Sequence, residues 1–239
     1  MDFYGKKVVV YGAGVSGLSA WQLVREHGGN AVVYDDNPQK SHATSSTRVF
    51  ADCDMIVLSP GVPPSTPVVL DARLEGKQVI SELELASSFC RAEQIAVTGT
   101  NGKTTTVMLI DAILKAAGIR SYAVGNIGAA FSAVADRLDA TETAVVEASS
   151  FQLETSARFA PDIAVMLNIT PDHLDRHGNM ERYIGAKARI FLNQSECDWA
   201  VYNAEDPNVT SLVPVMRARR IPFSTSRPVD GAYVSSGFR

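Results

Sequence analysis

Short apolar, β-branched runs alternate along the chain with helix-length amphipathic segments. This alternation is typical of parallel sheets whose strands are connected by helices, so the sequence predicts an α/β fold. Strands are expected at residues 7–11, 31–35, 55–58, around Val79, and at 95–97, 144–147, 163–168 and 199–203, and the final GAYVSSGFR predicts the start of another. Helices are expected at 15–27, 105–117 and 181–193.

A polar stretch, SSFCRAEQ, separates two sets of these elements. We expect a domain boundary near Arg91, with a Rossmann-like domain at residues 1–91 and a P-loop-type domain with a mostly parallel sheet at residues 92–239. At 239 residues and 46% apolar content, the chain is long enough to bury a sizeable core. The pattern therefore predicts a globular protein of two domains.

Composition narrows the range of partners. The formal net charge is −4, from 22 basic and 26 acidic residues spread along the chain, so the basic stripe typical of nucleic-acid binding is missing. The three cysteines lack CxxC spacing, which favours free, reduced thiols over disulfides or a zinc site. The N-terminus is unlike a signal peptide, and the apolar runs are too short to span a membrane. We therefore expect a cytoplasmic protein with neither nucleic-acid nor membrane partners.

The first glycine-rich loop, GAGVSG, lies between a predicted strand and a predicted helix. Gly12, Gly14 and Gly17 form a G-x-G-x-x-G pattern, and Asp35 follows 18 residues after Gly17, where a dinucleotide-binding fold holds a ribose hydroxyl. An NAD-dependent oxidoreductase is therefore one alternative, and a tight turn without a ligand is another. Only about 90 residues precede the next glycine loop, fewer than two mononucleotide-binding halves need, which counts against NAD.

The second glycine-rich loop, TGTNGKTT, follows a predicted strand and begins a predicted helix. Its backbone N–H groups can surround phosphates, Lys103 can neutralise β- and γ-phosphate charge, and the Thr104 hydroxyl can bind Mg²⁺. Val97 stands where the usual pattern has a leading glycine, so the loop is a variant. We predict ATP or GTP binding, against the alternative of a glycine-rich turn with an incidental lysine. The predicted nucleotide ligands are Gly99, Thr100, Asn101, Gly102, Lys103, Thr104 and Thr105.

Three polar residues follow at or near the predicted strand ends. Glu147 ends a strand at the edge where α/β sheets bind ligands, so its carboxylate can bind a metal ion or simply be solvated. His173, in the loop after another strand, can be a metal ligand or a loop histidine. Lys187 lies in an amphipathic helix, where a solvated charge is the default.

Five ordered motifs resemble those of the Mur ligases: TGTNGKTT, GNIG, EASSFQLE, NITPDHLDRH and YIGAKARIF. The N-terminal GAGVSGLSA, LSPGVP and SELELA extend the resemblance over nearly the whole chain. Within the family, SSFQLE and LSPGVP are most similar to the members that add D-glutamate. The resemblance implies ATP-dependent formation of an amide bond between UDP-N-acetylmuramoyl-L-alanine and D-glutamate, through an acyl phosphate, in peptidoglycan precursor synthesis.

The resemblance also implies roles for individual residues. Lys103, Glu147, His173 and Lys187 would be catalytic; Thr104 and Glu147 would hold one Mg²⁺, and His173 a second, together with Lys187 in carbamylated form. Carbamylation requires an unprotonated amine, so Lys187 should be shielded from water with a lowered pKa. The UDP-linked substrate would contact Val15, Ser16, Asp35, Ser59, Gly61, Asn126, Ser149, Gln152 and His173.

Mur ligases have a third, C-terminal domain that binds the incoming amino acid, and this sequence ends before it. We therefore expect that the 239-residue chain binds the uridine nucleotide but does not complete the ligation. Separately, we expect a monomer. The alternatives are another Mur ligase, a folylpolyglutamate synthase-like ligase, or a non-catalytic nucleotide-binding module. SSFQLE argues against the first two.

Overall fold

The computed structural model describes residues 1–42 and 46–235, and the chain forms two compact units. The first unit comprises Met1–Arg91, Gly128–Asp139 and Phe151–Phe159, and the second comprises Ala92–Ile127, Ala140–Ser150 and Ala160–Arg239. Two segments from the second half of the sequence thus pack into the first unit. These units are made of several segments each, and the division of the chain into two continuous domains at Arg91 stays a prediction.

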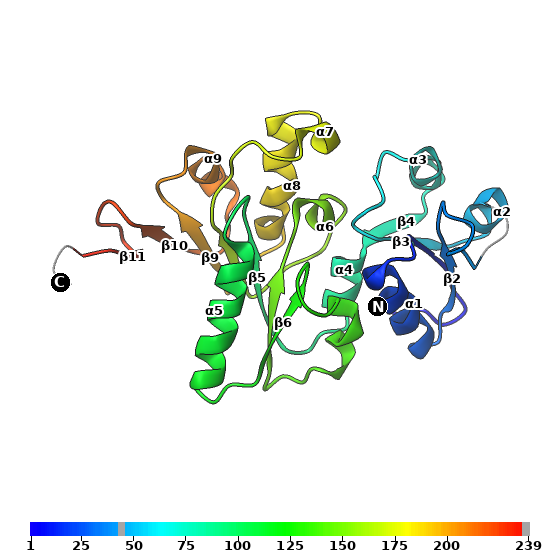
Figure 1. Ribbon diagram of the computed structural model, residues 1–239, viewed down its shortest axis with the longest axis horizontal. Helices are drawn as coiled ribbons and strands as arrows, with labels where there is room; N and C mark the ends of the chain where they lie inside the picture. Colours follow the sequence, from blue (N-terminus) through cyan, green and yellow to red (C-terminus); the bar gives the residue numbers. More distant parts are fainter. Residues whose placement is uncertain (43–45, 236–239) are drawn as a thin grey trace. The chain divides into compact units, whose positions relative to one another are not determined.

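The first unit is built on a four-stranded parallel sheet with strand order β2-β1-β3-β4 (Figure 1). Side chains alternate between its faces: Val8 and Val10 pack with α1 and α4, whereas Val9 and Tyr11 pack with α2 and α3. The elements are β1 (Lys7–Tyr11), α1 (Val15–Glu26), β2 (Asn30–Tyr34), α2 (Ser46–Ala51), β3 (Met55–Leu58), α3 (Pro67–Leu74), β4 (Gln78–Ser81), α4 (Glu82–Ser87), η1 (Phe131–Ala133) and η2 (Ala135–Arg137).

The order of this sheet creates a switch point between β1 and β3. The chain leaves β1 for β2 on one side and returns to β3 on the other, and open α/β sheets bind ligands where the carboxyl ends of two such strands meet. The first glycine loop follows β1, and LSPGVP follows β3. The fold therefore brings these two motifs to one crevice.

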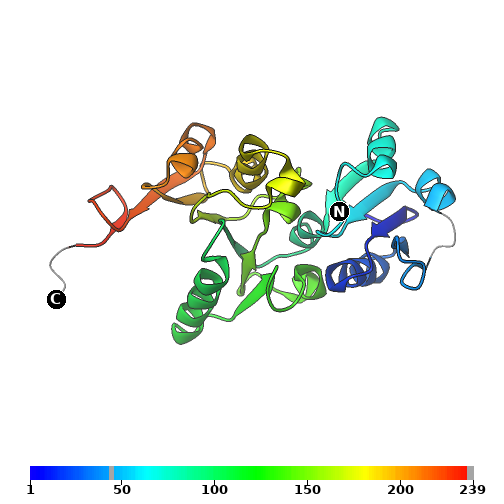
Figure 2. The same ribbon diagram turned by 45° about the horizontal axis from the view of Figure 1, so that its top comes forward.

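The second unit contains a seven-stranded parallel sheet with the order β11-β10-β9-β8-β5-β7-β6. Helix α5 covers one face of it, and α8 and α9 cover the other (Figure 2). The elements are β5 (Glu93–Thr98), α5 (Lys103–Ala116), β6 (Ser121–Gly125), β7 (Thr143–Glu147), α6 (Ser150–Glu154, which continues into the first unit), β8 (Ile163–Met166), α7 (Leu174–His177), α8 (Met180–Leu192), β9 (Trp199–Asn203), α9 (Pro207–Thr210), η3 (Val213–Val215), β10 (Arg219–Ser224) and β11 (Ala232–Tyr233).

The predicted α/β class with parallel sheets is confirmed, and most predicted elements agree with the structure within two residues. The strand predicted to end at Asn168 is too long, because β8 ends at Met166. Strands β6 and β10 and helices α2, α3 and α4 were not predicted. The strand expected in GAYVSSGFR begins as β11, and residues 236–239 lie outside the described part. Within the described ranges, every helix is too short or too polar to cross a membrane.

Glu82, at the start of α4, is buried among atoms of the first unit. It is 1% exposed; its Oε1 accepts hydrogen bonds from Ser132 N and Oγ at 2.8 and 2.6 Å, while Oε2 has no partner among the described residues. Burial raises the pKa of this carboxyl above its usual value, and the Ser132 hydrogen bonds oppose that shift only in part. Folding therefore favours the neutral acid more than the unfolded chain does.

We expect Glu82→Gln to remove part of the pH dependence of stability. Because the folded state raises the pKa, it binds more protons than the unfolded chain above pH 4.5, so stability is lost as pH rises through the folded pKa. Urea unfolding should find the variant equal to or more stable than the wild type at pH 8, with the difference shrinking toward pH 5. Glu75→Gln, at an exposed position, is the control. A difference that does not vary with pH would contradict the prediction.

Candidate functional site

Asp35 fixes the backbone of the first glycine loop. Its Oδ2 accepts a hydrogen bond from Ala13 N at 2.7 Å, and its Oδ1 accepts one from Asn37 N at 2.9 Å. These backbone donors, that of Ala13 first, hold the pKa of Asp35 below its usual value. The carboxylate is thus ionised and already hydrogen-bonded to the loop itself, and its contact with the UDP-linked substrate stays a prediction.

Ser59 closes the same crevice from β3. Its hydroxyl donates to Gly12 O at 2.9 Å, and the residue is 8% exposed. A Cβ added at Gly12 would lie 2.7 Å from Ser59 Cβ, and one added at Gly17 only 1.8 Å from Gly12 O, so both positions require glycine. Val15, which is exposed, and Ser16 form the first turn of α1, and Gly61 is exposed in the loop beyond Ser59. The structure therefore gathers five predicted substrate residues at the switch point.

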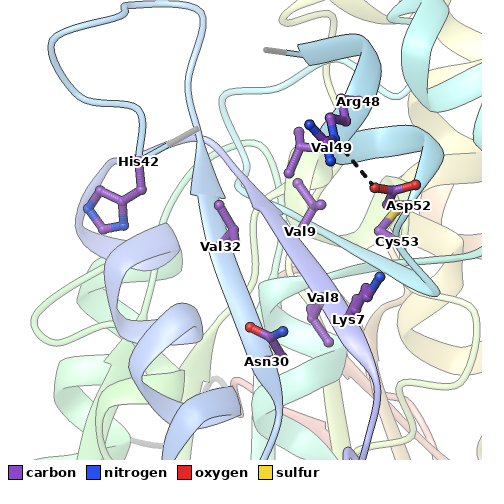
Figure 3. A pocket seen from close by; sticks show the side chains of 10 residues that line it. All are labelled: Lys7, Val8, Val9, Asn30, Val32, His42, Arg48, Val49, Asp52 and Cys53. Atoms are coloured by element: carbon purple, nitrogen blue, oxygen red, sulfur yellow. Dashed lines mark ion pairs between the residues drawn. The ribbon is translucent and has the colours of Figure 1, made fainter. Parts of the chain in front are cut away.

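A separate hollow of about 310 Å³ lies over the first sheet, between β2 and α2 (Figure 3). Its floor is apolar, and Arg48 at its rim lies 3.9 Å from its ion-pair partner Asp52, the first residue after α2. None of the predicted site residues lines it. The ten lining residues are Lys7, Val8, Val9, Asn30, Val32, His42, Arg48, Val49, Asp52 and Cys53. This hollow is therefore separate from the predicted site.

The second glycine loop joins β5 to α5 in the second unit. Gly102 precedes the helix with a φ of 85°, a left-handed conformation that favours glycine, and Lys103 begins α5. The Asn168 side chain brackets the loop: its Oδ1 accepts from Asn101 N at 2.8 Å and its Nδ2 donates to Asn101 O at 3.0 Å. Val97, where the usual pattern has glycine, is a fully buried residue of β5. The departure from the usual pattern therefore lies within β5, and the loop that follows the strand retains Gly99 and Gly102.

Glu147 lies beside this loop at the end of β7. It is 2% exposed, its Oε2 accepts from the Thr104 hydroxyl at 2.8 Å, and its Oε1 accepts from Asn126 Nδ2 at 2.9 Å. Both donors are uncharged. A buried carboxylate with neutral partners at a phosphate loop is well suited to bind a hard cation, because carboxylate and hydroxyl oxygens are the ligands that Mg²⁺ prefers.

Lys187 is buried, in contrast to the solvated charge that helix periodicity suggests. It is 1% exposed, and its Nζ lies 4.9 Å from the centre of the Tyr183 ring. Its Nζ and that of Lys103 both donate to Gly99 O, at 2.7 and 2.9 Å, so two amines share one carbonyl. Burial first, and the Lys103 charge second, lower the pKa of Lys187 to about 7. The amine is therefore shielded and partly unprotonated near neutral pH, as carbamylation requires, while carbamylation itself stays a prediction.

We expect Lys187→Met to be more stable than the wild type at pH 6.5, by a few kcal/mol. Between pH 7 and about 10 the unfolded lysine binds a proton that the folded one has lost, so wild-type stability rises with pH over this window and the difference shrinks by pH 9. Urea unfolding in carbon dioxide-free buffer measures this, with the exposed Lys115→Met as control. A constant difference between pH 6.5 and 9 would show that Lys187 is charged throughout.

His173 is largely exposed, unlike Glu147 and Lys187. Its φ of 51° is left-handed, its side chain is 51% exposed, and its Nε2 lies 3.5 Å from Asp172 Oδ2. Within the described ranges, no group of three or more His, Cys, Asp or Glu side chains forms a metal site. Ser149 follows β7 in the second unit, whereas Gln152, which is 1% exposed, belongs to the first. The metal and substrate roles of these residues stay predictions.

Two residues that bind the loop were not among the predicted site residues. The Tyr183 hydroxyl is 3.1 Å from Thr100 Oγ1, and Thr100 Oγ1 also accepts from Thr170 N at 3.0 Å. Asn168 is the other. It lies two residues after the end of β8, and a polar residue just past a strand was the signal available for it. Tyr183 gave no such signal, because it lies within a helix.

Comparison with known families extends these observations. The family model of the Mur ligase middle domain matches residues 97–234, and that of the Mur ligase MurD-like N-terminal domain matches residues 6–81. Two curated relatives, each named UDP-N-acetylmuramoylalanine--D-glutamate ligase, come from Pelotomaculum thermopropionicum and Chlorobium luteolum. They are 42% and 41% identical over 99% and 96% of this chain, which spans 56% and 54% of their lengths.

Solved structures agree on the fold. A UDP-N-acetylmuramate:L-alanyl-gamma-D-glutamyl-meso-diaminopimelate ligase from Neisseria meningitides aligns with a TM-score of 0.59 at 16% identity, over 95% of this chain and 82% of its own. A UDP-N-acetylmuramate-alanine ligase from Thermotoga maritima aligns with a TM-score of 0.51 at 23% identity, over 93% of this chain and 53% of its own. With both of its halves matched by family models and by relatives about 40% identical, this chain belongs to the Mur ligase family.

Proposed function

We propose that this chain is part of the catalytic machinery of an ATP-dependent ligase that adds D-glutamate to UDP-N-acetylmuramoyl-L-alanine in peptidoglycan precursor synthesis. The relatives named for that reaction support the choice of substrates. The structural observation that carries the proposal is the cluster of Lys103, Thr104 and Glu147 at the mouth of a phosphate loop. The reaction belongs to the cytoplasm, where its nucleotide substrates are made.

The proposed reaction has two steps. An oxygen of the substrate carboxylate attacks the γ-phosphorus of ATP, the bond to ADP breaks, and an acyl phosphate forms. The D-glutamate nitrogen then attacks the acyl carbon, inorganic phosphate leaves with the electron pair, and the nitrogen loses a proton. An anion attacks a polyanion in the first step, so Lys103 and the backbone donors at the start of α5 would contribute by offsetting that repulsion.

The residues beside the loop fit Mg²⁺. Thr104 and Glu147 supply a hydroxyl and a carboxylate, and Mg²⁺ usually completes such a set with phosphate oxygens and water. Bound there, the ion would neutralise phosphate charge. A second ion at His173 and carbamylated Lys187 is part of the same proposal, in which the carbamate supplies the carboxylate-like ligand.

We expect Glu147→Gln to uncouple nucleotide binding from Mg²⁺. The amide keeps the size of the side chain and an acceptor oxygen for Thr104, but it lacks the charge that attracts the ion. Calorimetric titration with ATP should therefore show affinity that rises roughly tenfold with Mg²⁺ in the wild type and is nearly unchanged by it in the variant. Glu93→Gln, exposed at the start of β5, is the control. Equal Mg²⁺ dependence in both proteins would remove Glu147 from the metal site.

The substrate assignment is tested by titrating the folded chain with UDP-N-acetylmuramoyl-L-alanine and, separately, with NAD. A cooperative thermal transition first establishes that the sample is folded. We expect the uridine substrate to bind and NAD not to bind. Binding of NAD alone would overturn the proposal and restore the oxidoreductase alternative. Binding of UDP-N-acetylmuramate but not of its L-alanyl derivative would point instead to a different Mur ligase.

A further inference from the structure

The SELELA motif, residues 81–86, has no task in the reaction proposed above. Its three polar side chains are nevertheless almost inaccessible to water: Ser81 is 2% exposed, Glu82 1% and Glu84 3%. Glutamates are rarely buried so completely unless they are paired, and the first helical turn after a strand offers easy access to solvent. The leucines of the motif explain its packing, but they do not explain why its polar residues are inside.

Each polar side chain of the motif binds a segment that comes from much later in the sequence. Glu82 accepts from Ser132 in Gly128–Asp139, as described above. The Glu84 carboxylate accepts a hydrogen bond from Ala157 N, and the Ser81 hydroxyl contacts that of Ser156 at 2.7 Å, both in Phe151–Phe159. The motif therefore forms hydrogen bonds with both of the later segments that complete the first unit.

One series of these hydrogen bonds has a fixed direction. The Ser156 hydroxyl donates to Gln152 O at 2.8 Å, which uses its single proton, so Ser81 must be the donor between the two hydroxyls. Ser81 Oγ in turn accepts from Glu84 N at 3.1 Å. The series runs from the backbone of α4 through two buried hydroxyls to the backbone of Gln152, which is a predicted substrate residue.

We propose that SELELA is a positioning motif for the substrate. The Ser81 and Ser156 hydroxyls fix the backbone of Gln152, so that its side chain meets the muramoyl-alanine end of the UDP-linked substrate. This assignment rests on the proposed function, because it takes Gln152 as a substrate ligand. Ser81 and Ser156 act through Gln152 and do not touch the substrate themselves.

Two ligands separate positioning from general stability. UDP alone needs only the glycine loop and LSPGVP, whereas UDP-N-acetylmuramoyl-L-alanine also needs Gln152. Calorimetry on the full chain should show that Ser156→Ala weakens binding of the second ligand about tenfold and changes binding of UDP less than twofold. Ser88→Ala is the matched control, since its hydroxyl donates only within the end of α4, to Leu85 O at 2.7 Å. It should bind both ligands as the wild type does.

Glu84 provides a second, independent test. Glu84→Gln keeps an acceptor oxygen for Ala157 N and should bind the larger ligand within threefold of the wild type, whereas Glu84→Leu should lose about as much affinity as Ser156→Ala. If Ser156→Ala does not fold, Ser81→Ala replaces it. Equal losses for both ligands, or no loss for either, would overturn the positioning role and leave the proposed function intact. Failure of the wild type to bind the larger ligand would overturn both.

Discussion

Lys103→Ala should lower the affinity of the chain for Mg²⁺-ATP by roughly 100-fold, a loss of about 3 kcal/mol of binding free energy. The Lys103 ammonium donates to Gly99 O and Thr100 O, so its charge is held within the loop where β- and γ-phosphates would lie. Removing it leaves neutral backbone donors and the partly unprotonated Lys187 amine to face a polyanion. Calorimetric titration with ATP, at fixed Mg²⁺, measures the effect.

A lysine at the other end of the same helix provides the control. Lys115 pairs with Asp111 at 2.7 Å and is 57% exposed, so Lys115→Ala should bind ATP within twofold of the wild type. The melting temperature distinguishes a loss of ATP binding from a loss of folding. Lys103→Ala removes a charge that opposes protonation of Lys187, so its melting temperature should equal or exceed that of the wild type. ATP affinity within threefold of the wild type would contradict the assignment of the phosphate loop.

Gly17→Ala should destabilise the first unit by about 3 kcal/mol or more and abolish binding of uridine nucleotides. The added Cβ would lie 1.8 Å from Gly12 O and 2.6 Å from Ser59 Oγ, distances at which backbone must move. A shift of Gly12 or of Ser59 would open the crevice between β1 and β3, because the Ser59 hydroxyl donates to Gly12 O. Urea unfolding followed by circular dichroism measures the loss of stability.

Gly14→Ala in the same loop is the matched control. An added Cβ there meets nothing within 4 Å, and its φ of −75° suits any residue, so its unfolding should stay within about 1 kcal/mol of the wild type. Weaker uridine nucleotide binding by this stable variant would indicate that phosphate approaches the Gly14 backbone. Wild-type stability of Gly17→Ala would show that the loop is not as tightly packed as the structure indicates.

The sequence was sufficient for the fold class because its strands are short and bounded by glycine loops. It was insufficient where polar residues are buried. Helix α4, which was not predicted, carries Glu82 and Glu84, and these two residues bind groups 50 and 73 residues away in the sequence. Strand β6 was missed because SYAVG is short and carries little of the alternation that marks a strand. Contacts between distant segments decided both cases.

The same limit applies to the candidate site. Residues at strand ends could be grouped from the sequence, because the carboxyl ends of parallel strands share one edge, and Lys103, Thr104 and Glu147 meet there. The contact between Asn126 and Glu147 could not be predicted, since it depends on β6 pairing beside β7. The burial of Lys187 likewise depends on which face of α8 meets β5, and periodicity places a lysine in water by default.

The hydrogen bonds of SELELA to later segments affect when the first unit can fold during synthesis of the protein. Residues 1–91 leave the ribosome first and contain all four strands of their sheet. The hydrogen-bond partners of Glu82 and Glu84 are synthesised later, because Ser132 lies 50 residues after Glu82 and Ala157 lies 73 residues after Glu84. Until then both carboxylates gain more from hydration than from burial, so α4 should dock late. Domains usually fold as units during translation, N-terminal first. Here the first unit becomes complete only when Phe159 has emerged, after residues 92–127 and 140–150 of the second unit.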